Sequence, residues 1–315
     1  QRVVIRQHPE RARTLREAGI EPVELAFGGW SDFRTPAALK REIRAFHPDV
    51  ALTWMNRASR MLPQGDFVHV GRLGGYYKLK YYRKCDHLIG NTEDIREYLI
   101  GDGWPAERAH YLPNFVSGTK AEPAGRGQFY TPDGAPLVVA MGRLHENKAF
   151  DVLLEAMARI PGVYLWIAGE GPLRAELEKK AEVLGVKPRT RFLGWREDTQ
   201  ALLASADVFV CPSRHEPLGN VVLEAWAQGA PVVAADSYGP GSLIDNRETG
   251  MLVPVDDAPT MARAIQNLLE DTKLRHRIAR QGQQAYKKDF TEKIIVDRYL
   301  EFFESVTKKT DEDTA

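Results

Sequence analysis

A chain of 315 residues is longer than one ordinary hydrophobic core requires, so its length predicts two domains. The composition, with 43% hydrophobic and 27% charged residues, excludes a disordered protein, and no apolar run is long enough to span a bilayer. The formal net charge is +0, and the only cysteines, Cys85 and Cys211, exclude a disulfide framework and lack metal-ligand spacing, which fits a reducing compartment.

Strands and helices are expected to alternate through residues 1–116. Short apolar and β-branched runs mark the strands, while proline, glycine and capping residues mark the helix ends. The expected strands are 2–6, 22–26, 50–54, 67–70, 88–91 and 109–112, and the expected helices are 9–19, 35–47, 76–84 and 92–100. Such alternation predicts an α/β fold with a parallel, doubly wound sheet.

A segment rich in Gly, Pro and Ser, residues 117–134, is predicted to be a linker, after which the alternation restarts. The expected strands are 137–142, 163–168, 191–193, 207–211 and 231–235, and the expected helices are 149–159, 173–184, 198–205, 221–228, 259–270 and 291–306. We therefore expect one domain at 1–116, a second at 135–290, and a C-terminal helix and polar tail at 291–315. The acidic run 311–313 is expected to be solvated rather than to bind a metal.

Two glutamates, Glu216 and Glu224, flank the start of the helix expected at 221–228. A buried strand precedes them, Asn220 is the expected N-cap, and Gly229 is expected to end the helix. Both carboxylates then lie beyond the carboxyl end of a strand, where open α/β sheets bind ligands. Carboxylates accept hydrogen bonds from hydroxyls, and bare backbone beside a helix N-terminus suits a phosphate. The competing interpretation is a capped helix with two solvated glutamates.

Two cations follow the strand expected at 137–142. Arg143 comes directly after Gly142, and Lys148 precedes the next helix. A guanidinium fork and an ammonium point charge at a strand's carboxyl end suit a diphosphate. The alternative is that both are ordinary surface charges.

Two further strand ends carry glycine or an aromatic residue. Gly169 and Gly171 form a tight strand-to-helix turn that allows close backbone approach, although the full dinucleotide fingerprint is missing. Trp195 ends the strand near 191–193, where it would either face a nucleobase or belong to the core.

Six segments, taken in their order along the chain, resemble those of the retaining glycosyltransferases of family 4, which have the GT-B architecture. The set is Gly-Arg-Leu with a following lysine, Gly-Glu-Gly-Pro, Phe-Leu-Gly, two glutamates separated by seven residues, Gly-Ala-Pro-Val-Val, and Thr-Gly-Met-Leu-Val-Pro. The resemblance extends over almost the whole chain and is strongest from Gly142 to Val255. It implies two Rossmann-like domains facing a cleft, with the last helix crossing back to the N-terminal domain.

The resemblance also implies roles for the candidate residues. Glu216 would bind hydroxyls of the donor sugar and Glu224 the ribose, while Arg143 and Lys148 would hold the diphosphate and stabilise it as it leaves. No metal or other cofactor is expected beyond the nucleotide diphosphate sugar itself. The expected donor-binding residues are Gly142, Gly169, Gly171, Trp195, His215, Leu218, Gly219, Asn220 and Glu224.

The sequence departs from the family pattern at two places. Family members usually begin with a strand, a glycine-rich turn and a helix, and none precedes Val3, so we expect a truncated chain with an incomplete N-terminal domain. The family often places a histidine at the end of the strand matching 67–70. Here His69 lies within that strand, where it is either a catalytic residue or a structural one.

We therefore expect a retaining glycosyltransferase of the hexosyltransferase type, acting in lipopolysaccharide or other envelope glycan synthesis. Its expected substrates are a nucleotide sugar, bound by the C-terminal domain, and a glycan or lipid-linked acceptor, bound by the N-terminal domain. The alternatives are a nucleotide-sugar-binding module without turnover and a nucleotide-sugar epimerase. The intact glutamate pair disfavours the epimerase.

The N-terminal half is expected to present a basic surface. From Arg34 to Lys84 there are 11 Lys/Arg and 3 Asp/Glu, and residues 76–84 interleave tyrosines with cations at helical spacing. An interfacial helix on an anionic membrane has this composition, and a partly buried helix with solvated lysines is the alternative. No nucleic-acid-binding motif accompanies the charge. The expected location is cytoplasmic, at the inner face of the cytoplasmic membrane.

Overall fold

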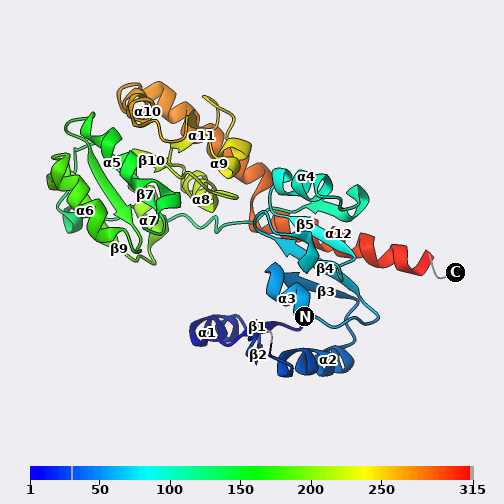
Figure 1. Ribbon diagram of the computed structural model, residues 1–315. Helices are drawn as coiled ribbons and strands as arrows, with labels where there is room; N and C mark the ends of the chain where they lie inside the picture. The colour runs from blue at the N-terminus through cyan, green and yellow to red at the C-terminus, as the bar shows by residue number, and fades with distance from the viewer. Residues whose placement is uncertain (30, 313–315) are drawn as a thin grey trace. The chain divides into compact units, whose positions relative to one another are not determined.

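The computed structural model describes residues 1–29 and 31–312, with side chains described up to Thr307. The chain divides into two compact units, many of whose elements are labelled in Figure 1. The first unit contains residues 1–112 together with the chain from Arg298, and the second contains residues 113–297. Both units are α/β with parallel strands, as the sequence predicts.

The second unit is built on one six-stranded parallel sheet of order β12-β11-β10-β7-β8-β9. Its strands are β7 (Leu137–Met141), β8 (Tyr164–Ala168), β9 (Thr190–Gly194), β10 (Val208–Cys211), β11 (Val232–Ala235) and β12 (Met251–Val253). Its helices are α5 (Phe150–Ala158), α6 (Arg174–Val183), α7 (Thr199–Ala204), α8 (Asn220–Gln228), α9 (Tyr238–Leu243), α10 (Ala258–Glu270) and α11 (Thr272–Asp289), with short 3₁₀ helices η3 (Arg126–Phe129), η4 (Glu146–Lys148) and η5 (Lys187–Arg189). The sequence order of the strands reverses at β7, as in a doubly wound fold.

The central strands of this sheet are buried on both faces. In β7, Val138 and Ala140 belong to one hydrophobic cluster, whereas Leu137, Val139 and Met141 belong to another. Successive side chains of a strand point to opposite faces, so a strand covered on both sides needs an unbroken apolar run. This requirement explains why β7 reads Leu-Val-Val-Ala-Met without polar alternation.

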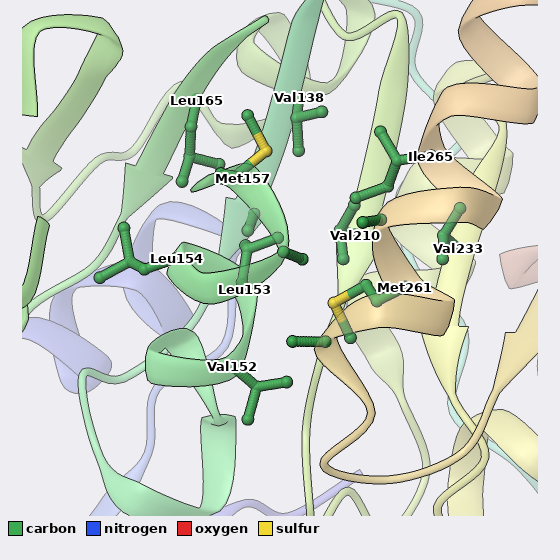
Figure 2. Close-up of a cluster of buried hydrophobic side chains, with 14 of the residues drawn as sticks. Val138, Val152, Leu153, Leu154, Met157, Leu165, Val210, Val233, Met261 and Ile265 are labelled. Atoms are coloured by element: carbon green, nitrogen blue, oxygen red, sulfur yellow. The ribbon is translucent and has the colours of Figure 1, made fainter. Parts of the chain in front are cut away.

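Helices cover both faces of the sheet. Side chains of α5, α6 and α10 fill the first cluster, and side chains of α7 and α8 fill the second. Figure 2 shows the first cluster, in which strand valines meet side chains of α5 and α10: Val138, Val210, Val233, Leu153, Met157, Met261 and Ile265. Because all six strands are parallel, their carboxyl ends lie along one edge, and the loops that follow them meet there.

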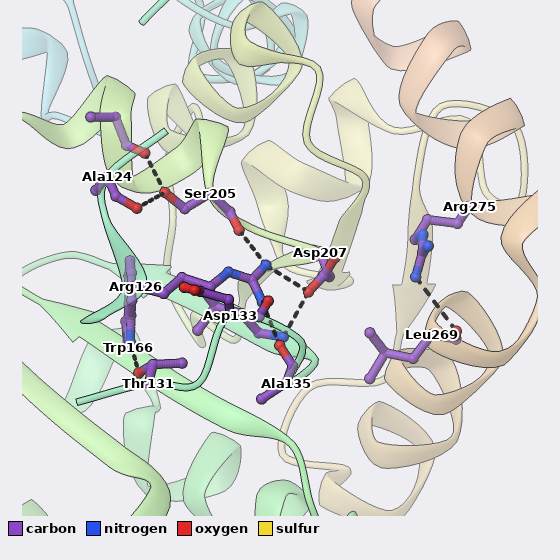
Figure 3. A network of polar contacts seen from close by, with 12 residues as sticks. Ala124, Arg126, Thr131, Asp133, Ala135, Trp166, Ser205, Asp207, Leu269 and Arg275 are labelled. Atoms are coloured by element: carbon purple, nitrogen blue, oxygen red, sulfur yellow. Dashed lines mark hydrogen bonds and ion pairs between the residues drawn. The ribbon is translucent and has the colours of Figure 1, made fainter. Parts of the chain in front are cut away.

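Residues 117–134, which we expected to form a linker, belong instead to the second unit. Figure 3 shows the contacts that hold them against it. Arg126 donates from Nη2 to Oδ2 of Asp207 over 3.0 Å, and Trp166 donates from Nε1 to Oγ1 of Thr131 over 2.9 Å. Polar side chains of this segment therefore form hydrogen bonds to the sheet of the second unit, at Asp207 just before β10 and at Trp166 within β8.

The first unit contains two parallel sheets, β1-β2 and β3-β4-β5-β6. The strands are β1 (Val4–Arg6), β2 (Val23–Leu25), β3 (Val50–Trp54), β4 (Val68–Leu73), β5 (His87–Gly90) and β6 (Ala109–Tyr111). The helices are α1 (Pro9–Glu17), α2 (Arg34–Phe46), α3 (Met55–Met61) and α4 (Glu93–Gly101), with η1 (Leu79–Tyr81) and η2 (Ala106–Arg108). The strand predicted at 67–70 continues to Leu73, so His69 lies near its start.

The last helix, α12 (Glu292–Glu312), packs its later turns on the four-stranded sheet. Phe302 and Val306 join a buried cluster with Val68, Val70 and Ile89. This apolar contact explains why the chain from Arg298 groups with the first unit. The helical backbone extends into the expected polar tail as far as Glu312, whereas residues 313–315 and the side chains of the acidic run lie outside the described residues.

The predicted helix at 76–84 is wrong, because only Leu79–Tyr81 is helical, as a 3₁₀ turn. Tyr82 is fully buried, and Tyr77 and Tyr81 pack against the same cluster as Leu73. These three tyrosines therefore pack into the core and do not form the apolar face of an interfacial helix. The exposed side chains of the segment are Tyr76, Lys78, Lys80, Arg83 and Lys84.

Three helices were missed, and α11 shows why. Its composition is mostly polar, and within it only Ile278, Gly282 and Tyr286 are buried, four residues apart. A stripe this narrow gives a weak periodic signal. The other missed helices, α3 and α9, have only seven and six residues.

Candidate functional site

Lys148 and Glu216, which lie 68 positions apart in the sequence, form an ion pair in the second unit. Lys148 follows β7 and Glu216 follows β10, and these two strands are neighbours in the sheet. The side chains are 21% and 13% exposed, respectively, so the pair is accessible without being fully solvated. Ser213 also contacts Oε2 of Glu216, with its Oγ at 3.4 Å. A cation and a carboxylate therefore share the edge of the sheet where parallel strands bind ligands.

The loop containing Glu216 is held by its neighbours through backbone contacts. The amide of His215 donates to the carbonyl of Asn147 over 3.2 Å, and the amide of Gly239 donates to the carbonyl of Glu216 over 2.8 Å. A Cβ at Gly239 would lie 2.5 Å from the carbonyl carbon of Leu218, which is too close for any other residue. The loops after β7, β10 and β11 thus fix the backbone around Glu216.

The predicted glycines lie in this same set of loops. A Cβ at Gly169 would lie 2.0 Å from the carbonyl oxygen of Gly142, and one at Gly171 would lie 2.3 Å from that of Leu144. The turn after β8 must therefore be glycine-rich so that it can pack directly on the loop carrying Arg143. Arg143 itself is exposed.

Glu224 lies one turn into α8 and lines a pocket of about 260 Å³. The same pocket is lined by Asn220, by Thr199 and Gln200 of α7, and by Phe115. Burial raises the pKa of Glu224, and the negative charge of Glu216 raises it further. The site thus keeps a partly desolvated carboxylate ready to accept hydrogen bonds from hydroxyls.

Replacing Glu224 by glutamine should stabilise the ligand-free protein at neutral pH. A folded-state pKa raised above the ordinary value of about 4.3 means that stability is lost as the pH rises through the folded-state pKa. Glutamine does not titrate there, so the Tm of Glu224→Gln should exceed that of the wild type by a margin that grows with pH. Thermal melts from acidic to neutral pH measure this margin, and parallel melts of the two proteins would contradict the burial argument.

The helix α8 begins one residue earlier than expected. Asn220 is its first residue rather than its N-cap, and Gly219 takes the cap position in a left-handed conformation with φ of 81°. The Asn220 side chain instead accepts a hydrogen bond from Nδ2 of Asn114 over 2.9 Å. Gly229 ends the helix in a left-handed conformation, as predicted, and Leu218 is buried beside the cap.

Two of the predicted donor-binding residues have exposed aromatic side chains: Trp195, which follows β9, and His215, which lies in the same loop as Glu216. Trp195 is 77% exposed, which excludes a place in the core and leaves its indole face open. His215 is also exposed and stacks on Tyr238 of α9, with ring centroids 6.3 Å apart and planes inclined by 14°. Tyr238 was not foreseen from the sequence, because α9 was missed.

His69 lies in the first unit and is enclosed by protein groups. It is 4% exposed within β4 of the first unit, and its ring is held between Thr53 Oγ1 and the carbonyl of Lys84, each at 3.0 Å. Desolvation lowers its pKa, so the neutral ring is favoured. Both ring nitrogens therefore contact protein atoms, as the structural alternative for His69 predicts.

Arg214 was missed by the sequence analysis and makes the largest set of ionic contacts near Glu216. It donates to Oδ1 and Oδ2 of Asp151 over 3.1 and 2.7 Å and to Oδ1 of Asp256 over 2.6 Å. Hydrogen bonding to Asp151 raises the pKa of Arg214. Burial raises the pKa of Asp151, but Arg214 outweighs it and the net pKa lies below the ordinary value. No local pattern could reveal partners 63 and 42 positions away.

Comparison with known proteins identifies the family. The family model for glycosyl transferases group 1 matches residues 123–285, which lie within the second unit. The chain is 42% identical over 303 residues to the lipopolysaccharide core biosynthesis glycosyltransferase LpsE of Rhizobium meliloti (strain 1021), covering 95% of this chain and 87% of the relative. It is 34% identical over 301 residues to LpsD of the same organism, covering 95% and 86%.

The chain belongs to the group 1 glycosyl transferases. It is therefore a glycosyltransferase, as the ordered motifs implied. A solved structure of Anabaena Alr3699/HepE in complex with UDP-glucose superposes with a TM-score of 0.85 at 21% identity, covering 96% of this chain and 91% of that one. This likeness agrees with the expected GT-B class of fold.

Two features are absent from the described part of the glycosyltransferase. Within residues 1–29 and 31–312, no helix combines the length and apolarity needed to cross a bilayer. Across the same residues, no group of three or more His, Cys, Asp or Glu side chains is arranged to hold a metal ion.

A second hollow of about 300 Å³ lies along β9 beside Tyr130, Lys187 and Arg191, and none of the candidate residues lines it.

Proposed function

We propose that this glycosyltransferase moves a sugar, with retention, from a nucleotide diphosphate donor bound by the second unit to an acceptor hydroxyl. The observation that carries the proposal is the pairing of Lys148 with Glu216 at the carboxyl ends of two adjacent strands. A diphosphate needs a cation and a sugar ring needs a hydroxyl acceptor, and a single donor molecule presents both groups a few bonds apart. The Glu224 pocket supplies a place for the ribose next to them.

In the proposed reaction, the bond between the anomeric carbon and the diphosphate oxygen breaks as the acceptor oxygen bonds to the same face of that carbon. The acceptor's proton passes to the departing phosphate oxygen. Lys148 and Arg143 stabilise the negative charge that develops on the diphosphate, and Glu216 orients the sugar through its hydroxyls. Before the donor binds, Lys148 and Glu216 neutralise each other, and we expect the donor's two groups to replace that mutual contact.

The experiment that tests the proposal is a screen of nucleotide sugars by thermal shift, followed by assay of the stabilising ones for sugar release. A donor at 100 times its Kd should stabilise the protein by about 2.7 kcal/mol. Transfer or slow hydrolysis of one stabilising donor would support the proposal. No stabilisation by any nucleotide sugar, together with no release of a nucleoside diphosphate, would refute it.

We propose further that transfer requires no metal, because Lys148 and Arg143 supply positive charge where the resemblance places the diphosphate. Activity should therefore persist in excess EDTA. Initial rates with and without chelator, after removal of contaminating metal from the donor, measure this. If EDTA abolished activity and Mg²⁺ or Mn²⁺ restored it, a metal cation would be needed to stabilise the diphosphate charge, and the two side chains would not suffice.

We propose that the acceptor is a lipid-linked saccharide of the cell envelope and that the protein works on the cytoplasmic face of the membrane. The support is the similarity to two lipopolysaccharide core glycosyltransferases over most of both chains. Exposed Lys78, Lys80, Arg83 and Lys84 in the first unit offer a cationic surface for lipid phosphates. Each such cation adds about 1 kcal/mol near an anionic leaflet.

Replacing those four cations by glutamine should reduce binding to anionic vesicles, because the tyrosines between them are committed to the core. Co-sedimentation with vesicles of anionic or neutral lipid measures the effect, and binding should fall with added salt. The matched control replaces four exposed cations of the second unit, Lys179, Lys273, Arg277 and Arg280, by glutamine. Equal recovery of the two variants with anionic vesicles would remove this surface from the proposal.

A further inference from the structure

Arg214 joins three loops of the second unit around the predicted donor site. It lies two residues before Glu216, in the loop after β10, and its side chain is 28% exposed. Its Nη1 donates to the carbonyl of Glu146 over 2.8 Å, in the 3₁₀ turn that ends at Lys148. Its Nε contacts Asp256, which follows β12. One guanidinium therefore connects the loops after β7, β10 and β12.

The contact with Asp151 fixes the orientation of this guanidinium. Asp151 lies in the first turn of α5, and each of its carboxylate oxygens accepts from a different Nη atom of Arg214. A bidentate pair of this kind holds both direction and distance, which a single ammonium cannot do. Arg214 is thus attached to the helix that begins just after Lys148.

The backbone beside Lys148 needs such support. Ala149 has a left-handed conformation with φ of 50°, and Asp256 has φ of 61°. A non-glycine residue in this region costs roughly 1–2 kcal/mol and persists only when its surroundings hold it there. Arg214 contacts the turn on one side of Ala149 and the helix on the other, and it contacts Asp256 directly.

We propose that Arg214 is a positioning residue for sugar transfer. It holds the 3₁₀ turn that ends at Lys148 and the loop that carries Glu216 at the separation that a sugar diphosphate requires. It acts through Lys148 and touches neither the donor nor the reacting atoms. The inference rests on the proposed function, because it assigns Lys148 to the diphosphate. It adds that the position of Lys148 depends on contacts made by a residue 66 positions away in the sequence.

The test is a double-mutant cycle on the affinity for a nucleoside diphosphate. Calorimetry with UDP, GDP and ADP first identifies which of them the wild type binds. Arg214→Ala should weaken that affinity about tenfold and lower kcat at saturating donor by more, since a misplaced group loses most in the transition state. In a Lys148→Ala background the same substitution should change affinity less than about twofold, because groups acting through one another are not additive.

Arg126→Ala is the matched control. Arg126 also pairs with an aspartate and donates to backbone carbonyls (Figure 3), but its partners Ser205 and Asp207 come just before β10 begins. Its loss should lower the Tm while leaving kcat and diphosphate affinity unchanged at a temperature where the variant is folded. If Arg214→Ala does not fold, Asp151→Asn and Asp256→Asn weaken the same contacts at nearly constant volume.

The outcomes separate the two proposals. Failure of the wild type to bind or turn over any nucleotide sugar refutes the proposed function. A wild type that is active, with Arg214→Ala changing only the Tm as Arg126→Ala does, overturns the positioning role alone. The positioning role would also be overturned if Arg214→Ala reduced diphosphate affinity by the same factor in the wild type and in the Lys148→Ala background. Arg214 would then not act through Lys148.

Discussion

Glu216→Gln should abolish most sugar transfer while leaving the folded second unit intact. The amide oxygen is a weaker acceptor for sugar hydroxyls than a carboxylate, and the change also leaves Lys148 without its charged partner. Loss of a charge-assisted hydrogen bond is worth about 1.5–3 kcal/mol, which converts to a fall in kcat/KM of about 10- to 150-fold. Steady-state kinetics with the identified donor measures it.

The control for this substitution is Glu176→Gln, which makes the same chemical change at an exposed position of α6. Its kinetics should match those of the wild type. Turnover by Glu216→Gln within twofold of the control would remove Glu216 from the reaction. A large loss accompanied by an equally large fall in Tm would instead assign Glu216 to stability.

Lys148→Ala should weaken binding of a nucleoside diphosphate more strongly than Arg143→Ala. Lys148 is partly buried against Glu216, so its charge-assisted bonds are poorly screened, and their loss should reduce affinity by about 10- to 150-fold. Arg143 is exposed, and an exposed ionic contact is worth only about 0.2–1 kcal/mol, or less than about sixfold. Calorimetric titration of both variants with the same diphosphate measures the ranking.

The nucleoside monophosphate provides an internal comparison, because it lacks the terminal phosphate assigned to the two cations. Its affinity should change less than that of the diphosphate in both variants. Lys180→Ala, which breaks a similar Lys–Glu pair between α6 and α5, should alter neither affinity. Equal losses for monophosphate and diphosphate would place the cations elsewhere on the nucleotide.

Much of the second unit could be predicted because its signals are local. A strand buried on both faces must be continuously apolar, so β7, β8, β10 and β11 stand out in the sequence. Parallel strands place their carboxyl ends on one edge of the sheet, and this rule alone predicts that Lys148 and Glu216 lie at the same edge. Gly229 marked a helix end because a left-handed conformation favours glycine.

Periodicity failed where tertiary packing decided the outcome. Residues 76–84 have tyrosines at helical spacing, but Tyr82 is needed in the core beside Leu88 and Ile95, and the backbone turns to place it there. His69 could have faced a ligand from a strand end. Instead β4 continues to Leu73 and leaves the histidine enclosed between Thr53 and the carbonyl of Lys84.

The sequence by itself determined the α/β class, the family and the strand ends that carry the charged residues, because each depends on neighbours within one element or on an ordered set of motifs. Only the tertiary structure decided that Lys148 pairs with Glu216 and that Arg214 joins Asp151 to Asp256. These partners lie 42 to 68 positions apart. Their contact depends on how β7, β10 and β12 are ordered in the sheet, which no local pattern of residues expresses.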